Sequence, residues 1–201
     1  MTSTATGVAT GEFRLNTVAG KVATDGENGA RVVADAAGRV LAVWGDTRSG
    51  NQDIYFRGST NGGDSWGSEI RLDAAAGTTN SYTPRIAADG AGGVYVIWVD
   101  YRNGTSDLYL NRSSDGGATW LGEVAIDTDT VGGAEQATLC VAGSAVYAVW
   151  SDNRSGNWRI YARTSGNGGA TWAAAVEIGT LGNPQDSKSQ RDPQIACDAT
   201  R

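Results

Sequence analysis

The sequence predicts an all-β fold, a β-propeller of four-stranded antiparallel blades, from three observations. A turn motif that ends in tryptophan occurs three times, with its tryptophans 54 and 52 residues apart. Short runs of alternating apolar residues surround each motif, and no window has a helical period. The 201 residues include 29 glycines and only 3 prolines. A repeat of this length is typical of a propeller, in which neighbouring blades bury each other's apolar faces.

The turn motif has the pattern Ser-x-Asp/Asn-x-Gly-x-Ser/Thr-Trp. It predicts a hairpin turn, because Asp or Asn accepts hydrogen bonds from nearby backbone N–H groups and Gly adopts angles that a side chain would forbid. The final Trp starts the return strand and offers a large apolar surface for packing between sheets. The structural residues of the three motifs are Ser59, Asn61, Gly63 and Trp66; Ser113, Asp115, Gly117 and Trp120; and Ser165, Asn167, Gly169 and Trp172.

Each repeat contains four predicted strands in one order, which for the first repeat are residues 31–35, 40–44, 53–57 and 69–73. The three blades are expected at about 30–73, 84–127 and 136–178, within a propeller segment over 12–201. A flexible leader is expected at 1–11. A spare last strand at 12–16 precedes the first blade, and a fourth blade starts at about 193–201. We expect either an excerpt of a longer propeller or a chain that self-associates to complete a ring.

The pattern at Ser113–Trp120 resembles the Asp box, or bacterial neuraminidase repeat, of sialidases and other Asp-box propellers. The resemblance covers roughly residues 12–198, although Asn61 and Asn167 replace the aspartate in two copies. It implies a sialidase-like propeller whose boxes lie on the face away from the catalytic centre. The three boxes are therefore expected to be structural.

The same resemblance would imply an arginine triad, a Tyr–Glu nucleophile pair and an Asp acid in a sialidase. The family's N-terminal Arg-Ile-Pro motif is not present, since residues 83–87 read Thr-Pro-Arg-Ile-Ala. Ordinary glycosidases need two carboxylates about 5–9.5 Å apart, and no unrepeated pair can be singled out. The sequence therefore assigns no catalytic residue.

A second repeated motif, Asp-x-Arg-x-Gly, follows the second strand of each unit and is expected on the face opposite the boxes. Its arginines can bind the carboxylates of acidic sugars or peptides, or can pair with the motif's own aspartates and fix the loop. Strict repetition favours the second interpretation. The unrepeated Tyr82, Tyr101, Trp158 and loop 181–190 are the better guide to a binding face. The candidate ligand-binding residues are Asp46, Arg48, Asp100, Tyr101, Arg102, Asp152, Arg154 and Trp158.

Composition excludes several classes of function. The net charge of −6 argues against nucleic acid, and the absence of histidine excludes a Ser-His-Asp triad and a His-liganded metal. We expect no metal and no cofactor, because the Asp46 and Asp53 region lacks the acidic density of a calcium loop. No apolar run reaches the about 18 residues of a membrane span. Cys140 and Cys197 could form a disulfide or remain two buried thiols.

The function predicted from the sequence is a non-catalytic binding or scaffold propeller, for which carbohydrate is the expected ligand class. The alternative is a fragment of an exo-sialidase or related glycoside hydrolase. Few lysines and a surface rich in Gly, Ser, Thr and Asn favour an extracellular or cell-surface location.

Overall fold

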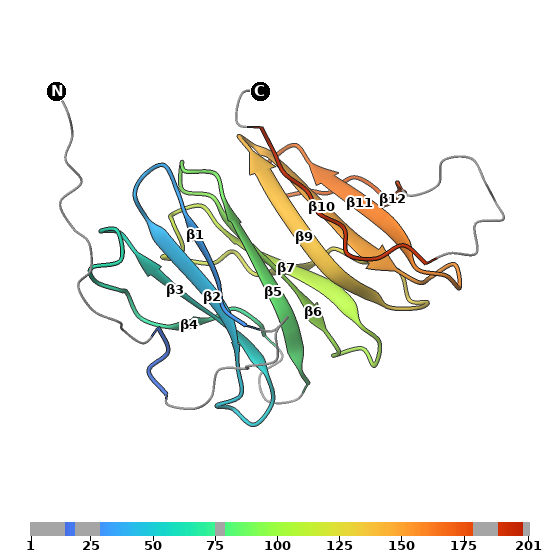
Figure 1. The fold of residues 1–201 in the computed structure, drawn as a ribbon, viewed down its shortest axis with the longest axis horizontal. Helices are drawn as coiled ribbons and strands as arrows, with labels where there is room; N and C mark the ends of the chain where they lie inside the picture. The colour runs from blue at the N-terminus through green and yellow to red at the C-terminus, as the bar shows by residue number, and fades with distance from the viewer. Residues whose placement is uncertain (1–14, 19–28, 75–78, 179–188, 199–201) are drawn as a thin grey trace.

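The computed structural model describes residues 15–18, 29–74, 79–178 and 189–198, so the leader expected at 1–11 lies outside the described residues. The described residues form three four-stranded antiparallel sheets side by side (Figure 1). The sequence predicted this all-β, four-stranded arrangement. No described segment is a helix long and apolar enough to cross a membrane.

The three sheets have the same strand order, in which each strand pairs with the next along the chain. Sheet 1 contains β1 (Arg31–Ala34), β2 (Val40–Asp46), β3 (Asp53–Ser59) and β4 (Ile70–Arg71). Sheet 2 contains β5 (Ser81–Ala88), β6 (Val94–Asp100), β7 (Asp107–Ser113) and β8 (Glu123–Ala125). Sheet 3 contains β9 (Ala134–Ala142), β10 (Ala145–Asp152), β11 (Arg159–Ser165) and β12 (Val176–Glu177).

The core lies between the sheets. Leu41, Ile54 and Leu72 of sheet 1 pack against Val96 and Trp98 of sheet 2, and a second cluster joins sheets 2 and 3 in the same way. Sheet 2 is covered on both faces, and every residue of β6 is therefore buried. Such a strand reads as a continuous apolar run rather than an alternating one.

The register places two kinds of loop at opposite ends of the strands. In sheet 2, Ser81 at the start of β5 pairs with Asp100 at the end of β6. Val94 at the other end of β6 pairs with Ser113, where the turn motif begins. The Asp-x-Arg loops therefore lie at the end of each sheet opposite the turn motifs, as the predicted strand order requires.

The spare strand predicted at 12–16 is described only for Leu15 and Asn16, which form bends rather than a strand. The Arg57 side chain nevertheless donates to the Leu15 carbonyl at 2.8 Å, as the Arg163 side chain donates to the Ile126 carbonyl at 2.8 Å. Leu15 thus has the same relation to sheet 1 that Ile126, just after β8, has to sheet 3.

The sequence predicted a strand from residue 193. This prediction is wrong, because residues 189–198 contain no strand. A strand needs a ladder partner, and the second strand of this unit is not among the described residues. The segment instead runs alongside β9 (Figure 1), to which a disulfide between Cys140 and Cys197 joins it. This disulfide decides between the two states that the sequence left open.

Candidate functional site

The three turn motifs are held by the same hydrogen bonds. The Ser113 hydroxyl accepts from the Gly117 backbone N–H at 2.9 Å, and Asp115 Oδ1 accepts from the Thr119 N–H at 2.8 Å. Hydrogen bonds from the Thr119 hydroxyl and N–H lower the pKa of Asp115 to about 2. The serine bond recurs at Gly63–Ser59 and Gly169–Ser165, and the Asp/Asn bond at Ser65–Asn61 and Thr171–Asn167. Such self-contained bonding suits a structural turn.

The tryptophans of the second and third motifs reach back to the preceding sheet. Trp120 packs into the cluster between sheets 1 and 2, and Trp172 into the cluster between sheets 2 and 3. Gly117 has a φ of 91°, and a Cβ there would lie 2.3 Å from the Phe56 ring. Glycine at this position thus allows both the turn and the approach of the neighbouring sheet.

The Asp-x-Arg loops form a second repeated network. In sheet 2, the Arg102 guanidinium lies 2.5 Å from Asp100 Oδ2 and 2.6 Å from Glu123 Oε2, and 3.9 Å above the Tyr109 ring. The Trp98 indole also donates to Asp100, at 3.3 Å. Burial acts to raise the pKa of Asp100, but hydrogen bonds from the Arg102 side chain and backbone outweigh it, and the pKa is lowered.

The Asp–Arg pair over a tyrosine ring recurs in the other two sheets, with a glutamate as the further partner in sheet 1 and two further aspartates in sheet 3. Arg48 pairs with Asp46 and Glu69 over Tyr55, and Arg154 pairs with Asp152, Asp127 and Asp129 over Tyr161. These are the contacts expected from the interpretation in which Asp and Arg fix the loop. Six of the eight candidate ligand-binding residues, the Asp and Arg of each motif, belong to this network.

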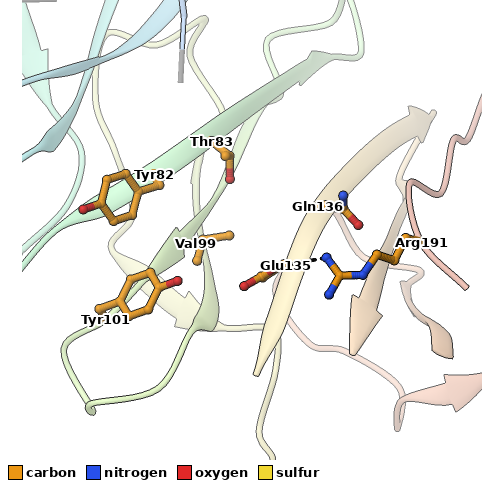
Figure 2. Close-up of a pocket in the computed structure, with 7 residues that line it drawn as sticks. All are labelled: Tyr82, Thr83, Val99, Tyr101, Glu135, Gln136 and Arg191. Atoms are coloured by element: carbon orange, nitrogen blue, oxygen red, sulfur yellow. Dashed lines mark ion pairs between the residues drawn. The ribbon is translucent and has the colours of Figure 1, made fainter. Parts of the chain in front are cut away.

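A cavity of about 340 Å³ lies at this same end, where sheet 2, sheet 3 and the segment 189–198 meet (Figure 2). The rings of Tyr82 and Tyr101 meet edge to face, with centroids 5.7 Å apart. Glu135 forms an ion pair with Arg191 at 3.8 Å. Figure 2 shows the tyrosines on one side, Arg191 on the other and Glu135 between them. The lining residues are Tyr82, Thr83, Val99, Tyr101, Glu135, Gln136 and Arg191.

Three lining residues occupy equivalent positions. Each directly follows a residue whose backbone N–H donates to a loop of the preceding unit: Ser81 to Gln52, Ala134 to Ser106 and Gln190 to Trp158, at 2.7, 2.7 and 2.9 Å. Each is also directly followed by a non-glycine residue with positive φ: Thr83 at 50°, Gln136 at 54° and Asp192 at 57°. The lining residues at this position are Tyr82, Glu135 and Arg191.

In sheets 2 and 3 this repeated backbone feature is a bulge at the start of the first strand. In β5, Thr83 and Pro84 lie opposite the single residue Trp98, and in β9, Gln136 and Ala137 lie opposite the single residue Trp150. A left-handed backbone costs a β-branched residue such as Thr83 on the order of 1–3 kcal/mol. Bulges of this kind re-aim side chains at functional sites. Here a repeated scaffold presents an aromatic ring, a carboxylate and a guanidinium to one cavity.

The sequence predicted part of this cavity. It singled out Tyr82 and Tyr101, which line it, and Trp158, whose ring lies 3.9 Å from the Arg191 guanidinium. It missed Glu135 and Arg191. Of the predicted binding loop 181–190, residues 181–188 lie outside the described residues. An alignment of the repeats could have found both missed residues. Glu135 and Arg191 align with Tyr82, at a position that differs in every repeat and lies two residues before the predicted first strand.

No protein-family model matches the chain, and no curated protein matches it by sequence. Solved structures share its fold. The α-L-arabinanase of Penicillium chrysogenum complexed with arabinobiose has a TM-score of 0.57 at 16% identity, over 78% of this chain and 52% of that one. The GH93 α-L-arabinofuranosidase of Fusarium graminearum has 0.52 at 17% identity, over 76% and 51%. The NanB sialidase of Streptococcus pneumoniae has 0.52 at 13% identity, over 74% and 23%.

These neighbours are β-propeller glycoside hydrolases. At such identities the likeness concerns the fold alone, so the three sheets of this chain are arranged as in part of a propeller. The chain spans about half the length of the arabinanase and the arabinofuranosidase, and about a quarter of the sialidase.

Proposed function

We propose that this chain is part of a β-propeller glycoside hydrolase and that the cavity between sheets 2 and 3 binds its glycan. The observation that carries this proposal is the gathering of two tyrosines and one Glu–Arg pair at equivalent positions before a positive-φ residue and in the adjacent loop. Tyrosine rings pack against the apolar faces of sugar rings, while carboxylate and guanidinium groups bond sugar hydroxyls. Concave sites with a few convergent polar groups are the usual ligand sites of proteins.

Within this proposal, the Asp-x-Arg network is scaffold and Tyr101 belongs to the binding surface. Tyr101 is 38% exposed, whereas Asp100 beside it is fully buried. Trp158 acts through Arg191, which it supports from one side. The Asp-box turns, at the other end of the strands, set the geometry of the sheets.

Glu135 is the one carboxylate among the described lining residues. Glycoside hydrolysis ordinarily uses two, one as acid and one as nucleophile or base. We therefore propose Glu135 as one member of such a pair, with the second supplied by another part of the full propeller. The non-catalytic binding module predicted from the sequence would use the same cavity without turnover.

An extracellular location belongs to the same proposal. The disulfide between Cys140 and Cys197 fits it, because disulfides persist in oxidising compartments. In that location the protein would encounter extracellular glycans.

The experiment combines binding and turnover. Arabinobiose and 4-nitrophenyl α-L-arabinofuranoside are titrated into the wild-type chain, Tyr101→Ala and Leu121→Ala, the last an exposed apolar residue just after the second turn motif. We expect binding by the wild type and by Leu121→Ala, with a loss of about tenfold in Tyr101→Ala. Equal affinity of all three proteins would contradict the placement of the binding site at this cavity. Absence of binding by all three would contradict the proposed glycan-binding function. Because the second carboxylate is proposed to lie in another part of the propeller, we expect this chain to bind without releasing nitrophenol, and release by this chain would contradict that placement.

A further inference from the structure

Glu135 and Arg191 face each other from equivalent positions on neighbouring units. Glu135 precedes the left-handed Gln136 of β9, and Arg191 precedes the left-handed Asp192. Their charged groups lie 3.8 Å apart, and the side chains are 35% and 43% exposed. The pair is thus accessible to a ligand and has no net charge of its own.

Arg191 is also held from sides that do not involve Glu135. Its guanidinium lies 3.9 Å from the centre of the Trp158 ring. Asp192, the next residue, donates its N–H to Gln136 Oε1 at 3.1 Å and accepts from Gln136 Nε2 at 2.5 Å. The disulfide at Cys197 joins the same segment to β9. Removing the charge of Glu135 would therefore leave the guanidinium near its place.

We propose that the Glu135–Arg191 pair makes the cavity select neutral sugars over acidic ones. One hydroxyl of a neutral sugar can donate a hydrogen bond to the carboxylate, and a neighbouring sugar oxygen can accept one from the guanidinium. Both charged groups then keep a partner. An acidic sugar would have to replace Glu135 as the partner of Arg191, and its carboxylate would then face the displaced carboxylate of Glu135. This inference rests on the proposed glycan-binding function and names the substrate class.

The pair differs from the arrangement that a sialic acid site would need. The described lining residues contain one arginine, and a carboxylate of the protein already engages it. Like-charge juxtaposition is a common means of rejecting a wrong ligand, and Glu135 supplies it here. Glu135 would therefore reject acidic sugars, and Arg191 would donate hydrogen bonds to the oxygens of any sugar that binds.

The test compares arabinobiose with N-acetylneuraminic acid by calorimetric titration of the full chain. The wild type should bind arabinobiose at least about tenfold more tightly. Glu135→Gln, nearly the same in shape, should weaken arabinobiose and strengthen the acidic sugar, so that the affinity ratio falls about tenfold or more. Arg191→Gln should weaken both sugars.

Asp64→Asn is the matched control, because it removes one negative charge from an exposed residue in the first turn motif, at the opposite end of sheet 1. Its affinity ratio should equal that of the wild type. An unchanged ratio in Glu135→Gln, with the sugars still bound, would overturn this inference and leave the proposed function standing. Binding of neither sugar by any variant would overturn both.

Discussion

The ring of Trp120 meets the ring of Phe56 edge-on, with centroids 5.0 Å apart and an interplanar angle of 71°, across the boundary between sheets 2 and 1. Trp120 ends the second turn motif, and Phe56 lies in β3 of the preceding sheet. A turn motif that is local in sequence thus supplies a contact between sheets.

Replacing Trp120 by alanine should therefore destabilise the protein. We expect Trp120→Ala to lower the free energy of unfolding by about 3 kcal/mol, the lower end of values for aromatic truncation, because the ring is partly exposed. Urea unfolding followed by circular dichroism measures this loss. Leu121→Ala is the control, since Leu121 directly follows the motif and is 54% exposed. Equal losses in the two variants would contradict the inter-sheet role.

The repeat, the turns and most strands could be predicted because their signals are local. Ser113 and Asp115 bond backbone groups within four residues, so the motif carries its own geometry. The strand at 193–198 failed because a ladder depends on a partner strand, which a local pattern does not supply.

The cavity could be predicted only in part. Tyr101 stood out as an aromatic residue in an otherwise repeated loop. Glu135 and Arg191 lie 56 residues apart, and they meet because a bulge in β9 and the equivalent positive-φ position at Asp192 aim them at one point. A bulge depends on pairing between strands, and the preceding side chain reads in the sequence as an ordinary strand residue.

Asp127 should contribute stability that is lost as the pH rises from about 4 to about 6. Burial, with the charges of Asp152 and Asp107, raises the pKa of Asp127 from 3.8 to about 6 despite the bond from the Asp129 N–H and the charge of Arg154. The folded state therefore binds more protons than the unfolded state in this window, and stability is lost as Asp127 ionises. Asp127→Asn should reduce this slope, as measured by urea unfolding at pH 4, 5, 6 and 7. A slope identical to that of the wild type would refute the assignment.

The disulfide should stabilise the segment that carries Arg191. Cys140 and Cys197 are 57 residues apart, and closing a loop of this length is worth about 4 kcal/mol in the chain-entropy model. Cys197→Ser should therefore lower the melting temperature, and dithiothreitol should lower that of the wild type equally. Thiol titration of the unfolded protein should find no free thiol before reduction and two after it. Two thiols before reduction would contradict the disulfide.

The outer face of sheet 3 should promote self-association. Ile178 is 54% exposed, whereas the equivalent Leu72 and Ile126 are 4% and 0% exposed beneath the next sheet. Ile178 also lines a cavity of about 420 Å³ with Val149, Ile160 and Ile195. Light scattering should find a mass above 20.8 kDa for the wild type and a lower mass for Ile178→Asp.

Val131→Asp is the control for this face, because Val131 is 64% exposed in the loop before β9. This variant should associate like the wild type. A monomeric wild type at every concentration would contradict the prediction.

The most direct test of the glycan-binding cavity is nuclear magnetic resonance of the ¹⁵N-labelled chain titrated with arabinobiose. The account predicts saturable shift changes in the backbone signals of Tyr82, Tyr101, Glu135 and Gln136, with the three turns that end in tryptophan unaffected. Shift changes confined to those turns, or none in the residues that line the cavity, would contradict it.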